Sequence, residues 1–169
     1  MAHLDHEGSS VKLLDEKDRV GLVSEHARVL TQEVVLCPGP SRYIELRDLH
    51  TWEAYKALLK AKAAKGSRRH RQLVRHIIGD SRHVKVDGQN RVRLGSELVD
   101  WADISPHKAD EDRPVKVIGV GDHIEIWSQP YYKSYRKELE GDFEETFDEL
   151  MMDDVPVDSA EEAPESDGI

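Results

Sequence analysis

Two stretches of this 169-residue chain decide its fold: Asp15–Glu25, which reads DEKDRVGLVSE, and Asp87–Glu97, which reads DGQNRVRLGSE. Both stretches fit the frame D-x-x-x-R-V-x-L-x-S-E. Such a frame rarely recurs by chance in one short chain, and an internal repeat is the first property to look for in a sequence. We therefore interpret the chain as a duplication, in which one small unit occurs twice.

The residues around each copy predict short strands. Apolar and polar residues alternate before and after each D-x-x-x-R segment, as in strands that bury one face. A further pair of apolar runs closes each half of the chain. In chain order, the expected strands cover residues 11–14, 20–22, 34–37 and 43–46, and then 82–86, 92–94, 115–118 and 123–127. Ser24 and Ser96 are followed by Glu, so each is expected to cap a short helix.

Three longer helices are also expected. Thr51 is expected to cap a helix over 52–64, and Ser67 one over 68–78 that ends at Gly79. Pro130 opens the third helix, which continues to about residue 140. The first of these helices carries an apolar stripe formed by Trp52, Tyr55, Leu58 and Leu59. On the second, four residues are expected to face the core: Leu73, Val74, Ile77 and Ile78.

The ends of the chain differ in composition from its body. Residues 1–10 and 141–169 are polar and acidic, so they bury too little apolar surface to offset the entropy of ordering and are predicted to be disordered. Between them, residues 11–80 form the first expected unit and residues 81–140 the second. Within the tail, four apolar residues have helical spacing, which is either a short docking helix or leftover amphipathicity: Phe143, Phe147, Leu150 and Met151.

The charge is divided between body and tail. The net charge is −10, but residues 138–169 contain 14 acidic and no basic residues, so the body carries 24 basic against 20 acidic residues. A basic body with an acidic tail is typical of nucleic-acid-binding proteins, although solubility alone also explains an acidic tail. We find no signal sequence and no membrane-spanning run, which favours a cytoplasmic protein. Cys37 is the only cysteine and is expected to be a small buried residue.

A second basic region lies between Ala54 and Gly79, where eight Lys and Arg residues occur without an acidic one. This region is either a second DNA surface or, as we favour, a solvated helix face or a partner for acidic groups of another subunit or of the tail. A tail that covered a basic face would compete with DNA.

The doubled frame, the Trp52-Glu53 helix start and the Glu125–Trp127 strand resemble the MraZ family. That family belongs to the AbrB-like swapped-hairpin barrels, so the resemblance implies an α+β fold: a duplicated β-rich barrel with peripheral helices and a pseudo-two-fold axis within one chain. It also implies a homo-oligomeric ring that binds double-stranded DNA through its loops. Members regulate, and typically repress, their own operon of cell-wall and cell-division genes, which implies a nucleoid-associated protein.

The resemblance assigns the DNA-binding role to Arg19 and Arg91 by motif position. An arginine fork binds a phosphate or the O6/N7 edge of guanine through two hydrogen bonds. Lys17 and Arg93 flank them and are proposed as DNA contacts on charge alone. The alternative is an Asp–Arg ion pair that only braces a hairpin. Two aspartates are expected to structure the loops by accepting backbone hydrogen bonds: Asp15 and Asp87.

The chain departs from the family at the residue before the motif arginine. The family usually has glycine there, whereas this chain has Asp18 and Asn90. Asn and Asp tolerate a left-handed backbone best among the other residues, so the loop shape is expected to survive. The Asp18 carboxylate next to Arg19 is expected to weaken a phosphate contact in the first copy.

No metal, cofactor or enzymatic motif is predicted. His3, Asp5 and His6 cluster in a terminus that we expect to be disordered, and His70 and His76 are not one helical turn apart. Neither a nucleophile elbow nor a phosphate-binding glycine loop occurs. The competing function is therefore a protein-binding one: an oligomeric scaffold or antitoxin-like module that acts through the acidic tail.

Overall fold

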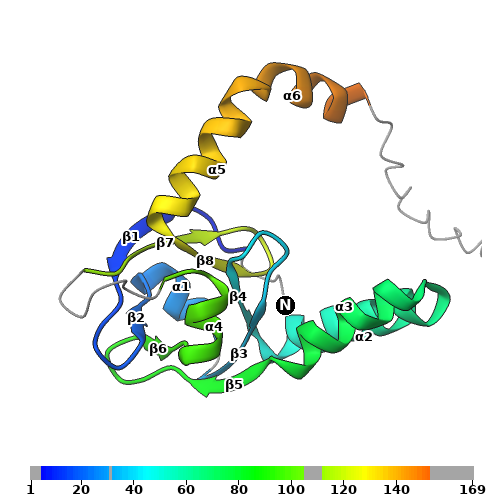
Figure 1. Ribbon diagram of the computed structural model, residues 1–169. Coiled ribbons are helices and arrows are strands. Elements are labelled where there is room, and N and C mark those ends of the chain that lie inside the picture. The colour runs from blue at the N-terminus through cyan, green and yellow to red at the C-terminus, as the bar shows by residue number, and fades with distance from the viewer. Residues whose placement is uncertain (1–4, 31, 105–111, 153–169) are drawn as a thin grey trace, which may run out of the picture. The chain divides into compact units, whose positions relative to one another are not determined.

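The computed structural model describes residues 5–30, 32–104 and 112–152, and divides the chain into two compact units, 1–134 and 135–169. The described elements (Figure 1) are, in chain order, β1 (Ser9–Leu13), β2 (Arg19–Gly21), α1 (Ser24–Val29), β3 (Glu33–Pro38), β4 (Ile44–Asp48), α2 (Leu49–Lys65), α3 (Arg68–Gly79), β5 (Arg82–Lys85), β6 (Arg91–Arg93), α4 (Ser96–Trp101), β7 (Pro114–Gly119), β8 (Ile124–Ser128), α5 (Gln129–Gly141) and α6 (Phe143–Met152). The predicted α+β class is confirmed.

The strands form a six-stranded antiparallel sheet and a separate two-stranded ribbon. The order in the sheet is β1-β7-β8-β4-β3-β5, and the ribbon pairs β2 with β6. Matching the two halves of the chain element by element pairs β1 with β5, β3 with β7 and β4 with β8. Under this matching the sheet order reads the same from either end, and the ribbon contains one strand from each half.

The larger hydrophobic core lies between the ribbon and the sheet. Val20 of β2 and Val92 of β6 are completely buried, together with sheet residues such as Ile44 and Ile126. Burying a side chain of this size contributes about 1.5–3 kcal/mol. Both halves of the chain therefore contribute side chains to one shared core.

A smaller core lies between the sheet and the α2–α3 hairpin, where Val35 and Cys37 of β3 pack against Trp52 and Ile77. Leu73 is 54% exposed, so the prediction that it faces the core is wrong, and Leu58 in the apolar stripe of α2 is half exposed. Among the described residues, no helix is long and apolar enough to cross a bilayer.

The N-terminal caps of the helices differ from the predicted ones at three of four positions. Asp48 caps α2, because its side chain accepts a hydrogen bond from Thr51 N at 2.7 Å. Ser24 and Ser96 are the first helical residues, and neither short helix has a side-chain cap. Only Ser67 caps its helix as predicted, in a capping box closed by the His70 side chain.

Both chain ends contain structure where disorder was predicted. His6 is buried and exchanges two backbone hydrogen bonds with Gly121, and β1 begins at Ser9. The region from 143 to 152 is helical, because acidic residues suit the first turn of a helix and the rings of Phe143 and Phe147 stack, with their centroids 6.3 Å apart. Residues 1–4 and 153–169 lie outside the described residues, so the prediction for them stays untested.

Candidate nucleic-acid interface

The first motif loop is closed by Asp15. Its Oδ1 accepts hydrogen bonds from the backbone N–H groups of Lys17 and Arg19, both at 2.9 Å, and its Oδ2 accepts one from Arg19 Nε at 2.7 Å. Slight burial works against ionisation, but the hydrogen bonds from Arg19 and Lys17 outweigh it and lower the pKa of Asp15. The loop therefore fixes both the turn and the orientation of its arginine.

The second motif loop repeats this geometry with Asp87. Its Oδ1 accepts hydrogen bonds from the N–H groups of Gln89 and Arg91 at 2.9 Å, and its Oδ2 binds Arg91 Nε at 2.8 Å. The backbone hydrogen bond from Arg91 is the main cause of the lowered pKa of Asp87. Asp18 and Asn90 have φ of 57° and 56°, which confirms that these residues take the left-handed conformation in place of glycine.

The ribbon brings the two loops together. In its register Arg19 lies opposite Arg93, Val20 opposite Val92, and Gly21 opposite Arg91. Backbone hydrogen bonds of 2.8 Å, from Leu22 N to Asn90 O and from Leu94 N to Asp18 O, extend the pairing into the loops.

Side chains alternate between the two faces of a strand, so the buried valines place the arginines on the opposite, outer face of the ribbon. We call Arg19, Arg91 and Arg93 the three-arginine face. Arg19 and Arg93 are like charges directly across a ladder, which costs stability unless an anion lies between them. Asp15 and Asp87 offset two of these charges through ion pairs, and the third arginine leaves the face with a net positive charge, which suits a polyanion.

The ion pairs with Asp15 and Asp87 leave part of each motif guanidinium available. The Arg19 and Arg91 side chains are 29% and 30% exposed, and each uses Nε for its ion pair. Within the described part of the chain, no hydrogen bond engages the Nη atoms of either residue. The two roles of each motif arginine are therefore compatible, because the carboxylate holds the guanidinium through Nε while the Nη atoms stay available for DNA. Lys17 lies in the adjacent loop, exposed and outside the ribbon.

Arg113, which the sequence did not indicate, neutralises Asp18. Its Nη1 lies 2.6 Å from Asp18 Oδ1, and its Nη2 donates to Asp15 O. The Asp18 carboxylate therefore has a counter-charge of its own, and its effect on a phosphate contact of Arg19 stays a prediction. The only sequence signal was indirect, since an acidic residue at a loop position normally held by glycine needs a partner.

In the second loop, the residues that correspond to Asp18 and Arg113 are uncharged. Leu14 N donates to Arg113 O, and at the matching place in the other half Val86 N donates to Gln32 O. Gln32 therefore corresponds to Arg113, as Asn90 corresponds to Asp18. One loop carries an ion pair, and the other carries two neutral amides.

The histidines do not form a metal site among the described residues. His6 and His26 are buried and contact each other edge to face, with ring centroids 5.4 Å apart, and burial lowers the pKa of His6. His76 pairs with Asp80 at 2.7 Å. His3 lies outside the described residues.

Comparisons with known proteins found a family model and several named relatives that are similar to this chain. A family model described as "MraZ protein, putative antitoxin-like" matches residues 77–154. Proteins named "Transcriptional regulator MraZ" are similar over most of their length: the Micrococcus luteus protein is 28% identical over 85% of this chain and 95% of its own. The Mycoplasmoides gallisepticum protein is 29% identical over 83% and 92%, and the Tropheryma whipplei protein 29% identical over 82% and 91%.

An α+β fold with a doubled D-x-x-x-R loop, similar along most of its length to proteins named as regulators of transcription, defines the class: the chain is a relative of transcription regulators. Within that class, the chain is similar to members of the MraZ family.

Proposed function

We propose that this protein is a sequence-specific regulator of transcription that binds double-stranded DNA through the three-arginine face, with Lys17 as a further phosphate contact. The observation that carries the proposal is the ribbon register, which gathers arginines from both motif copies on one surface. A two-stranded ribbon fits the major groove of B-DNA, where arginine pairs with the O6/N7 edge of guanine. By the family resemblance, its target is the promoter of its own cell-wall and cell-division operon, which it represses in the nucleoid.

The symmetric strand order supports a duplicated architecture. Residues 11–80 and 81–140 contribute matching strands to one sheet and one strand each to the ribbon. We propose that these segments are two AbrB-like units around a pseudo-two-fold axis, each too small to bury its apolar face alone.

Affinity is proposed to come from a homo-oligomer. One face with three arginines and a lysine neutralises few phosphates, so a single copy would bind weakly and lose affinity steeply with salt. Several copies on one duplex raise the effective concentration of each face, so that modest contacts combine. This arrangement suits a promoter with repeated short elements.

The test is fluorescence anisotropy with a labelled duplex from upstream of the protein's own gene, and a shuffled duplex, at two salt concentrations. We expect preference for the native duplex, weaker binding at high salt, and loss of binding in Arg19→Ala/Arg91→Ala. Arg68→Ala/Arg69→Ala removes two exposed charges from α3 and is the matched control, expected to bind like wild type. Equal binding of both duplexes, unaffected by the ribbon substitutions, would contradict the proposal.

A second candidate is a protein-binding scaffold that acts through the acidic tail. It is favoured by α6, where the apolar residues Phe143, Phe147, Leu150 and Met151 are all exposed. This function predicts that a protein co-purifies with the full-length chain, that it is retained by Arg19→Ala/Arg91→Ala, and that it is lost when these tail residues become polar.

A further inference from the structure

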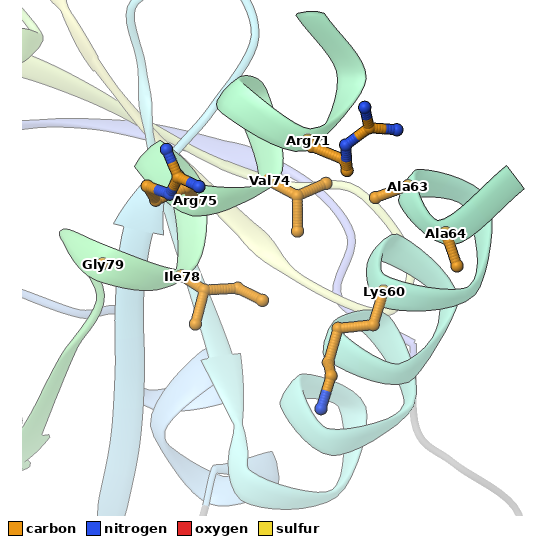
Figure 2. Close-up of a pocket in the computed structure, with 8 residues that line it drawn as sticks. All are labelled: Lys60, Ala63, Ala64, Arg71, Val74, Arg75, Ile78 and Gly79. Carbon is orange, nitrogen blue, oxygen red and sulfur yellow. The ribbon is translucent and has the colours of Figure 1, made fainter. Parts of the chain in front are cut away.

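The α2–α3 hairpin carries an open groove that the sheet does not fill (Figure 2). The groove has a volume of about 490 Å³, and its floor is formed by small and apolar residues: Ala63, Ala64, Val74, Ile78 and Gly79. Its rim is cationic, with Lys60 on α2 and Arg71 and Arg75 on α3. Arg71 Nη1 also donates to Gly66 O at 2.8 Å, which holds this side chain in place. An apolar floor with a basic rim suits an amphipathic acidic helix.

Helix α6 has the complementary pattern. Its exposed apolar residues recur with the spacing i, i+4, i+7, i+8 and therefore form one stripe: Phe143 (57% exposed), Phe147 (47%), Leu150 (62%) and Met151 (66%). Glu144 and Asp148 flank the stripe on one side, and α6 contains no basic residue. Within the second unit, as far as it is described, nothing covers this stripe.

We propose that α6 of a second copy of this chain docks in the α2–α3 groove. The apolar stripe would cover the groove floor, and the flanking carboxylates would pair with the α3 rim. Arg71 and Arg75 are four residues apart, as are Glu144 and Asp148, so the two charge pairs repeat at the same interval of one helical turn. A ten-residue helix is about 15 Å long, which is comparable to the twelve-residue α3 that it would lie along.

The proposed contact joins two different surfaces, so each copy offers its groove to one neighbour and its α6 to another. A head-to-tail contact of this kind builds closed rings or open chains of copies. It assigns a structural role to the basic helices, which the three-arginine face leaves without one. The inference rests on the oligomer of the proposed function, but it is tested by mass alone, without DNA.

The test is light scattering after size-exclusion chromatography on the full-length protein. The groove variant Arg71→Glu/Arg75→Glu and the helix variant Glu144→Arg/Asp148→Arg are each expected to fall from the wild-type mass to that of a smaller species. Mixed in equal amounts, the two variants are expected to regain the wild-type mass, because each altered groove then meets an oppositely charged helix. Circular dichroism checks that each variant is folded.

Two control variants reverse the same number of charges elsewhere on the same helices. Arg68→Glu/Arg69→Glu lies outside the groove, and Glu145→Arg/Glu149→Arg lies on the side of α6 away from the stripe; both are expected to keep the wild-type mass. The proposal fails if the wild-type protein is a monomer, or if a folded groove or helix variant keeps its mass. It also fails if the mixture stays small, since the two surfaces then do not meet between copies. DNA binding by the three-arginine face is measured separately by anisotropy, so that a failure of this contact and a failure of the proposed function can be distinguished.

Discussion

Replacing Arg113 with Gln tests how this chain tolerates an aspartate at Asp18. The Arg113 and Asp18 side chains are only 13% and 24% exposed, and their atoms approach to 2.6 Å. A hydrogen bond between charged groups contributes about 1.5–3 kcal/mol, and losing one partner leaves the other charge partly buried. We therefore expect Arg113→Gln to lower the free energy of unfolding by about 2–3 kcal/mol.

The other half of the chain provides the matched rescue. Asn90 and Gln32 occupy the corresponding positions without charge, so Asp18→Asn/Arg113→Gln copies an arrangement that this backbone already accepts. The double variant is expected to be more stable than the sum of the single losses predicts, by about 1–2 kcal/mol, because the unpaired carboxylate is gone.

The assay is urea unfolding at a fixed protomer concentration, since the stability of the proposed oligomer would depend on concentration. The free energies of unfolding of the wild type, the two single variants and the double variant are compared, provided that their m-values agree. If the losses of the two single variants sum to the loss of the double variant within about 0.5 kcal/mol, the pair is not coupled and the reasoning is refuted.

Three further predictions concern the loops and the core. Gly95 has φ of 82°, and an added Cβ would approach Arg82 Nη1. Gly95→Ala should therefore lower the free energy of unfolding by about 1–3 kcal/mol and lower Tm. Gly88→Ala, whose Cβ would meet nothing within 4 Å, should leave Tm unchanged. The pKa values of Asp15 and Asp87 are lowered in the folded protein. The stability that their carboxylates contribute is therefore complete above their unfolded pKa near 4 and is lost as the pH falls through their folded pKa. The urea midpoint of Asp15→Asn/Asp87→Asn should therefore fall less between pH 5 and pH 3 than that of the wild-type protein. Burial raises the pKa of the Cys37 thiol to about 12, so it should react with a thiol reagent only after unfolding, and fast labelling of the native protein would contradict this.

The parts of the fold that could be predicted from sequence are those set by local pattern. The alternation of Val20 with Leu22 places both on a buried face, and the structure buries both. The cap of α2 could not be predicted in the same way. Thr51 and Asp48 both lie close to the helix start, and the choice depends on where β4 ends, which is fixed by its pairing with β3 and β8.

The candidate site was predicted as residues but not as a surface. Sequence position identified Arg19 and Arg91 from the motif, and Arg93 only from its charge. That Arg93 lies opposite Arg19 depends on a pairing between strands 72 residues apart, which no local pattern reveals. Arg113 was missed for the same reason, since it reaches Asp18 across 95 positions of the chain.

The two halves of the chain keep one backbone and differ in charge. Gly21 occupies in β2 the place that Arg93 occupies in β6, so Arg19 faces an arginine across the ribbon while Arg91 faces a glycine. The Asp18–Arg113 pair strengthens the same difference, because its counterparts Asn90 and Gln32 are neutral. Backbone geometry tolerates these exchanges, since the loops need only a left-handed residue and an aspartate at their start. The proposed duplication accounts for the symmetric sheet order, whereas the charges proposed to contact DNA differ between the two halves and have to be derived copy by copy.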